Sequence, residues 1–164
     1  MKKVLIAVLT GGALLATGTP ALAQAARPLL GPYGYGKVKL GMSAKKAKAT
    51  GKVVLKRAAG LEACSGWDFT AHPTRKASVG LYISKKVGVA VISAPKGVKT
   101  PEGIGIGSTM KQVKKAYPRL RYVMGTGRPY VSVPGNPKAY YEFFPEKGIV
   151  TGLALGLGTQ DCVS

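Results

Sequence analysis

The chain has 164 residues, with 25 Lys and Arg against six Asp and Glu, and a formal net charge of +19 at pH 7. This length supplies one ordinary domain, or two very small repeats that share a core. One histidine and two cysteines are too few for a zinc cluster, so neither a metal site nor a cofactor is predicted. The excess of cations favours anionic partners, without choosing among cell-wall polyanions, phospholipid headgroups, nucleic acid and acidic proteins.

The first residues are typical of a bacterial export signal. Lys2 and Lys3 precede an apolar run over residues 4–16, which is shorter than the roughly 20 residues of a membrane span. Small residues in Ala21-Leu22-Ala23 match the cleavage rule for such signals. We therefore predict a signal peptide at 1–23, with alternative cuts after Ala25 or Ala26. The competing interpretation is an uncleaved anchor or a buried helix.

The mature chain is predicted to be extracellular. Loss of Lys2 and Lys3 with the signal lowers the formal charge from +19 to +17, and no second membrane span follows in the sequence. Export exposes Cys64 and Cys162 to oxidising conditions, so one disulfide between them is expected. Closing a loop of roughly 100 residues stabilises a fold by about 4–5 kcal/mol in the chain-entropy description.

An internal echo with an offset of 66 residues links Leu40–Lys48 to Ile106–Lys114. In both segments a glycine precedes a hydroxyl residue, Ser43 or Thr109, and lysines follow. A hydroxyl side chain is a good helix N-cap, and Gln112 completes a capping box with Thr109. Two short helices are therefore predicted, the first ending at Gly51 and the second at Pro118.

Alternating apolar residues after each helix predict antiparallel strands. These strands cover residues 53–55, 67–69, 79–83, 89–92, 121–124, 130–133, 139–144 and 149–157. The predicted class is α+β, with two helix-plus-antiparallel-hairpin repeats packed as one small domain. Its predicted divisions are an N-terminal linker at 24–36, repeat one at 37–97 and repeat two at 98–164.

A family resemblance follows from these segments. The Gly41-Met42-Ser43 block, the helix after it, Gly66-Trp67 and a strand–loop–strand hairpin together resemble the β-lactamase inhibitor protein-like fold. Small outer-membrane assembly lipoproteins of the SmpA/OmlA type share the same helix-plus-hairpin unit. The resemblance runs from about Gly36 to Cys162 and differs from the inhibitor family in having one cysteine in each half. It implies a secreted tandem-repeat fold that binds a partner and performs no chemistry.

Catalytic residue types are sparse. His72 lies in a predicted loop, where most histidines serve only as surface residues. The alternative makes His72 a general acid with Glu62 or Glu142 as base, and Arg75 or Arg128 holding a phosphate. That set would suit a small secreted nuclease or hydrolase. No other catalytic motif is present, so a non-enzymatic protein is predicted.

Binding residues are predicted in two basic stretches and one aromatic segment. The basic candidates are Lys45, Lys46, Lys48, Lys111, Lys114, Lys115, Arg119 and Arg121. If the two halves pack side by side, these stretches merge into one basic face; otherwise each is a solvated helix face. Tyr33 and Tyr35 form either a contact loop or an edge strand that caps the core.

The combined prediction is a secreted, inhibitor-like binding module whose partner is an anionic protein or a cell-envelope polymer. A basic envelope-binding or nucleic-acid-binding protein is the first alternative, and the nuclease or hydrolase built on His72 is the second. The sequence does not determine the oligomeric state.

Overall fold

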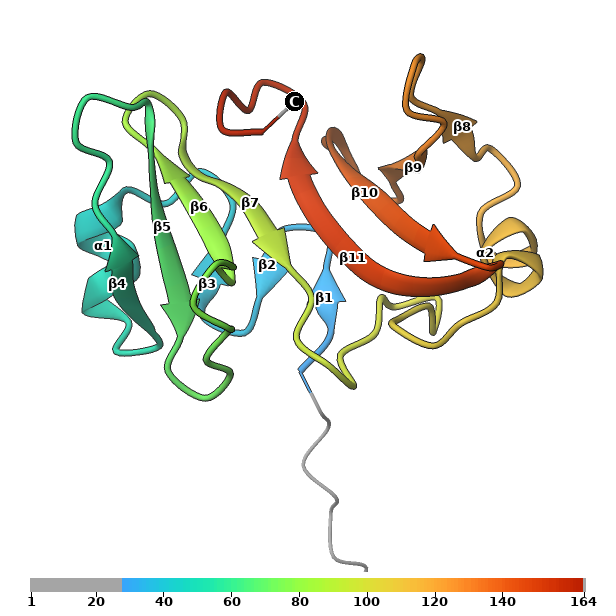
Figure 1. The fold of residues 1–164 in the computed structure, drawn as a ribbon, viewed down its shortest axis with the longest axis horizontal. Coiled ribbons are helices and arrows are strands. Elements are labelled where there is room, and N and C mark those ends of the chain that lie inside the picture. The colour runs from blue at the N-terminus through green and yellow to red at the C-terminus, as the bar shows by residue number, and fades with distance from the viewer. Residues whose placement is uncertain (1–27, 164) are drawn as a thin grey trace, which may run out of the picture.

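The structure, a computed structural model, describes residues 28–163 (Figure 1). The predicted signal peptide and its cleavage site lie outside the described residues. No helix among residues 28–163 has the length and hydrophobicity that a membrane crossing requires.

The predicted α+β class is wrong, because the fold is mostly β. Among residues 28–163, strands make up 43% and helices 10%. Eight strands form one antiparallel sheet in the order β4-β5-β6-β7-β11-β10-β9-β8. These strands are β4 (Val53–Arg57), β5 (Cys64–Phe69), β6 (Leu81–Ser84), β7 (Gly88–Ser93), β8 (Arg121–Tyr122), β9 (Pro129–Val133), β10 (Asn136–Glu146) and β11 (Ile149–Leu157).

The two helices are too short to form a layer of their own. They are α1 (Ala44–Ala49) and α2 (Met110–Ala116), with six and seven residues. Each helix buries a single residue, Ala47 in α1 and Val113 in α2. The strands therefore supply most of the buried apolar side chains, which is why a helix-plus-hairpin description fails.

The predicted helix caps are confirmed. Ser43 caps α1 by accepting a hydrogen bond from the Lys46 backbone N–H at 3.3 Å. Thr109 and Gln112 form the reciprocal capping box of α2, in which each side chain accepts from the other residue's backbone N–H. Local sequence therefore determines where both helices begin.

The pairing of β7 with β11 joins two antiparallel four-stranded units into one sheet. The paired positions are Ser93 with Ala154, Ile92 with Leu155, and Val91 with Gly156. In Figure 1 the β4–β7 unit and the β8–β11 unit form two wings on either side of this junction. The repeat boundaries predicted at 37–97 and 98–164 remain predictions.

The glycine of each echo segment and the residue after it make equivalent backbone contacts in the two halves. Gly41 N–H donates to the Val89 carbonyl, and Val89 N–H donates to the Met42 carbonyl. In the second half Gly107 N–H donates to the Val150 carbonyl, and Val150 N–H donates to the Ser108 carbonyl. A reciprocal pair of backbone hydrogen bonds thus connects the segment before each helix to a strand of the large sheet.

A second, three-stranded sheet covers the core side of the large one. It contains β1 (Leu30–Gly31), β2 (Gly34–Tyr35) and β3 (Val38–Lys39). Leu30 is fully buried, and its carbonyl accepts a 2.7 Å hydrogen bond from the Tyr141 hydroxyl. Residues 30–36 of the segment predicted as a linker belong to this sheet and to its turns.

Side chains of β10 alternate between the two faces of the large sheet. Tyr141 and Phe143 are fully buried in the single main core that both sheets enclose. Tyr140, Glu142 and Phe144 point to the opposite side, which we call the outer face. The outer face therefore carries the charged side chain of this strand segment, Glu142.

Asp68 is a buried acid that holds the loop after β5 against the sheet. Its carboxylate lies 2.8 Å from the Lys56 ammonium and accepts hydrogen bonds from Thr74 and from the Gly80 backbone N–H. Burial alone would raise the pKa of this carboxyl group. The hydrogen bonds from Lys56, Thr74 and Gly80 outweigh that effect and lower the pKa to about 2.

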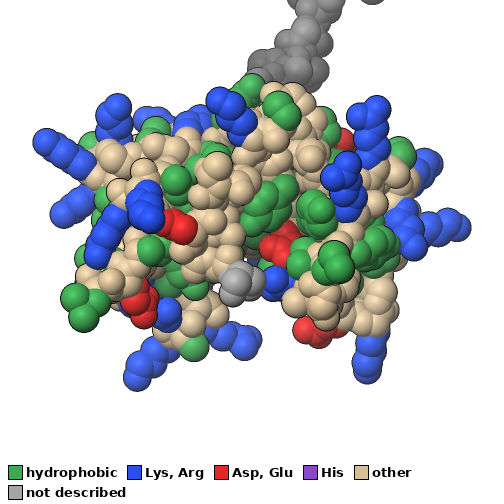
Figure 2. All heavy atoms as spheres, turned by 90° about the horizontal axis from the view of Figure 1, so that it is seen from above, with side chains coloured by type: hydrophobic (Ala, Val, Ile, Leu, Met, Phe, Trp, Pro, Cys, Tyr) green, Lys and Arg blue, Asp and Glu red, His purple; other side chains and the backbone are tan. Residues whose placement is uncertain are grey.

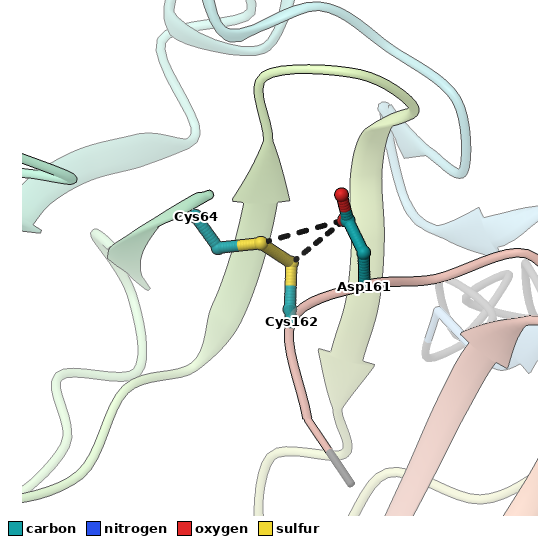
Figure 3. A group of neighbouring side chains, drawn as sticks. All are labelled: Cys64, Asp161 and Cys162. Carbon is teal, nitrogen blue, oxygen red and sulfur yellow. Dashed lines mark hydrogen bonds between the residues drawn. A yellow bond between two sulfur atoms is a disulfide. The ribbon is translucent and has the colours of Figure 1, made fainter. Parts of the chain in front are cut away.

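The predicted disulfide between Cys64 and Cys162 is confirmed (Figure 3). The Cα atoms are 5.5 Å apart, and the bond ties the segment after β11 to the start of β5. The Asp161 carboxylate lies 3.6 Å from the Cys64 sulfur and 3.9 Å from the Cys162 sulfur. Because both sulfurs are consumed by the disulfide, this group of three is not a metal site.

Removal of the disulfide is predicted to destabilise the fold strongly. The double variant Cys64→Ser, Cys162→Ser should lose about 4–5 kcal/mol of unfolding free energy, because the unfolded chain regains a loop of roughly 100 residues. Urea unfolding of both proteins measures the difference, with thiol titration of the native protein as the control. Two titratable thiols, or an unchanged unfolding free energy, would contradict the prediction.

Protonation of Asp68 is predicted to weaken the fold in acid. Its pKa in the folded chain, about 2, lies below its ordinary value of 3.8, so its stabilisation is complete above about pH 4 and is lost as the pH falls toward 2. The contribution is about 2 kcal/mol. Unfolding free energies at pH 5 and 2.5 should differ less in Asp68→Asn than in the wild type. The exposed Glu62→Gln is the matched control, and identical pH profiles for all three proteins would contradict the assignment.

Candidate functional site

The two predicted lysine clusters do not merge. Lys45, Lys46 and Lys48 are exposed on α1, and a second exposed set lies on α2, comprising Lys111, Lys114 and Lys115. Figure 1 places α1 and α2 at opposite ends of the large sheet. The single basic face expected from side-by-side halves is therefore absent among residues 28–163, because the β7–β11 pairing joins the units edge to edge and leaves α1 and α2 at opposite ends of the sheet.

Arg119 and Arg121 lie in the segment that follows α2, close to β9. Both line a cavity of about 540 Å³ that also contains Val131 and Val133. Both arginines are exposed. The structure thus divides the second predicted basic stretch between a helix surface and a groove at the sheet edge.

The two tyrosines of the N-terminal segment have different environments. Tyr33 is 59% exposed, and its hydroxyl donates a 3.0 Å hydrogen bond to the Gly135 carbonyl. Tyr35 is buried, with its ring edge-on to Phe69 at a centroid distance of 5.1 Å. Burial raises the pKa of the Tyr35 hydroxyl. Of the two, only Tyr33 is available to a partner.

His72 does not lie with the carboxylates that the nuclease alternative requires. Its Nε2 atom is 3.2 Å from the Tyr35 hydroxyl, in a cavity of about 240 Å³ whose lining contains no Asp or Glu. Glu62 precedes β5 and His72 follows it, so the length of a strand separates them. Glu142 lines a different cavity, in the other half of the sheet. The predicted acid–base set is therefore not assembled.

The outer face holds a cavity that the sequence did not predict. Its volume is about 410 Å³, and we call it the outer-face cavity. Three stretches of chain form its wall: the β8–β9 hairpin, β10, and the segment after β11. The residues that line it include Val123, Arg128, Tyr130, Ser132, Lys138, Tyr140, Glu142, Gln160 and Val163.

An ion pair forms the polar part of this cavity. Arg128 Nε lies 2.9 Å from Glu142 Oε1, and the guanidinium group stands 5.5 Å from the centre of the Phe144 ring. The Nε–H is not directed at the carboxylate, so Nε is buried without a hydrogen-bond partner among the described residues. The Glu142 side chain is nine-tenths buried and lines the cavity. Arg128 and Glu142 thus form an ion pair that is largely shielded from solvent, and their side chains can still form further hydrogen bonds.

Tyr140 lies flat over a glycine on the neighbouring strand. A Cβ atom at Gly156 would stand 2.7 Å from both Cζ and Oη of Tyr140, so only glycine allows this ring position. Burial raises the pKa of the Tyr140 hydroxyl, and the nearby charge of Glu142 adds to the rise. Gly156 therefore shapes one side of the outer-face cavity.

The sequence contains part of the information needed to predict this cavity, but it does not identify the cation that pairs with Glu142. Glu142 interrupts an aromatic strand, and a carboxylate on a sheet face needs a cation nearby. Which cation it meets depends on the register of β9 with β10, in which Tyr130 faces Glu142. Sequence spacing alone does not show that Arg128 is the partner.

Comparisons with known proteins give a fold and no function. No protein family matches the chain, and no curated protein matches it. Among solved structures, the chain is similar to the crystal structure of the uncharacterized protein YfeY from Escherichia coli. That match has a TM-score of 0.50 and 14% sequence identity, and it covers 79% of this chain and 99% of YfeY. At this identity the likeness concerns the fold alone.

Substitution at Gly156 is predicted to test the cavity's construction. Gly156→Ala should destabilise the protein by about 1–3 kcal/mol, because the added methyl group collides with the Tyr140 ring. In Tyr140→Ala, Gly156→Ala the collision is absent, so the double variant should be more stable than the sum of the single effects predicts. Urea unfolding of all four proteins gives this coupling. Gly158→Ala, where the new Cβ is in ordinary 3.5 Å contact with Lys138, is the control. Strict additivity would contradict the packing.

Proposed function

We propose that the mature chain is an exported, non-enzymatic protein that binds an extended polyanion, either an anionic cell-envelope polymer or an acidic protein. The observation that carries this proposal is the state of its charges. Residues 28–163 contain 22 Lys and Arg, of which only Lys56 and Arg128 form ion pairs. The other 20 are exposed to solvent.

The few acids add little to the surface. All six lie within the described residues, and Asp68 and Glu142 are buried in ion pairs. The Glu102 carboxylate accepts a 2.6 Å hydrogen bond from the Tyr117 hydroxyl. Two acids are therefore buried in ion pairs, and the 20 exposed cations face only the four remaining acids.

The distribution of cations favours a long partner over a compact one. Figure 2 shows Lys and Arg side chains projecting at both ends of the molecule. A small anion would need converging cations, whereas a polymer can contact separated ones in sequence. The separation of α1 from α2, which ruled out a single basic face, is compatible with such a partner.

Export and the absence of an assembled acid–base set support the rest of the proposal. A disulfide persists in oxidising compartments, which fits an extracellular location, and the sequence begins with features of an export signal. His72 has no carboxylate in its cavity. The inhibitor-like and nucleic-acid-binding alternatives both predict binding without catalysis, and the salt dependence of binding separates them.

Binding to charged polymers is predicted to fall steeply with salt. The mature protein should bind heparin and polyglutamate, and its affinity should drop by several orders of magnitude between about 50 and 200 mM salt. Replacing the three lysines of α1 by Gln should weaken binding and reduce the slope of log affinity against log salt by up to about three. The same change on α2 is the matched variant, and circular dichroism checks that both remain folded.

Two results would overturn the proposal. Affinity that does not change with salt would show that charge does not drive binding. Complete loss of binding from one lysine triple alone would show a compact site in place of distributed contacts. A strong preference for DNA over both other polymers at equal salt would favour the nucleic-acid alternative.

A further inference from the structure

We propose that the outer-face cavity is a binding site for a neutral saccharide ring. This inference goes beyond the proposed function, because it concerns a ligand without charge and does not depend on the exposed lysines. It rests on the cavity's walls, on its unused hydrogen-bonding groups and on the ion pair at its centre.

The polar groups of the cavity require a ligand that both donates and accepts hydrogen bonds. Glu142 makes no hydrogen bond with the described residues, and its only close polar contact is Arg128 Nε at 2.9 Å. The terminal amino groups of Arg128 also make none, although part of this side chain remains exposed. A hydroxyl group can donate to the carboxylate and accept from the guanidinium. Adjacent hydroxyls on one ring can therefore satisfy both partners at once.

The apolar walls match the other surface of a sugar. Tyr130 and Tyr140 both line the cavity, and a phenol ring offers an apolar face together with a hydroxyl group. The Gln160 amide supports this wall, because its oxygen accepts from the backbone N–H groups of Cys162 and Val163 and its nitrogen donates to the Val163 carbonyl. A volume of about 410 Å³ lies within the range of small-molecule sites.

Other ligand classes fit less well. A phosphate or carboxylate beside Arg128 would also meet the buried Glu142 carboxylate, and the other cation of the lining, Lys138, is exposed to solvent. An extended peptide that adds to a sheet needs free backbone groups at an edge. The cavity floor is β10, which is paired on both sides with β9 and β11 and has no free edge.

The disulfide holds one wall of this site in place. Gln160 and Val163 line the cavity from the segment after β11, and Cys162 between them is bonded to Cys64 in the other half of the sheet. Breaking the bond releases this wall, so saccharide binding should require the oxidised protein.

Calorimetric titration with the neutral disaccharides cellobiose, chitobiose and maltose tests the inference. At least one should bind the mature protein with an affinity that does not change between about 50 and 200 mM salt, since no charge is neutralised. Tyr130→Ala should weaken that binding about tenfold or more. The matched control is Tyr122→Ala, a tyrosine on β8 that is 52% exposed and does not line the cavity, and it should change the affinity less than about twofold.

A second variant tests the wall. Cys64→Ser, Cys162→Ser should lose saccharide binding while it still binds heparin, provided that circular dichroism shows it folded. If it is unfolded, Gln160→Ala replaces it and should weaken binding severalfold. The proposal is overturned if none of the three disaccharides binds, if Tyr130→Ala binds as the wild type does, or if only polyglutamate binds. If the mature wild-type protein binds a saccharide but neither heparin nor polyglutamate, the proposed function is overturned and this inference stands.

Discussion

The rest of the structure depends on the pairing of β7 with β11. Three paired positions carry the large sheet from one four-stranded unit to the other. Ile92 and Leu155 face the main core at this junction, while Val91 and Gly156 face outward. A slip of one residue would exchange the inner and outer faces of one unit relative to the other and expose core residues. The neighbouring β10–β11 register, in which Tyr140 pairs with Gly156, then sets the shape of the outer-face cavity.

The fold also buries two of the few acids in ion pairs and leaves most of the many cations exposed. Buried carboxylates are kept only where a cation or several donors meet them, as at Asp68 and Glu142. Nearly all Lys and Arg among residues 28–163 remain outside ion pairs. The outcome is a surface rich in cations outside ion pairs, and a sheltered cavity in which Arg128 meets Glu142. The ligands proposed for these two surfaces, a polyanion and a sugar ring, differ accordingly.

The disulfide connects these features to the compartment in which the chain is proposed to function. It joins β5 to the segment that completes the outer-face cavity, so one covalent bond stabilises the fold and positions Gln160. A reducing environment would weaken both. A disulfide persists in an oxidising compartment, and the export proposed for this chain would place it in one.

The sequence by itself determined the local features of this protein. Ser43, Thr109 and Gln112 act within three residues of their partners, so the helix starts could be predicted, and alternation identified the positions of the larger strands. The disulfide followed from counting, since two cysteines allow one pairing. Only the tertiary structure decided the mostly β class, the distance between α1 and α2, and the meeting of Arg128 with Glu142. These depend on which strands pair and in which register, and strand pairing joins residues far apart in the chain whose partners no local pattern specifies.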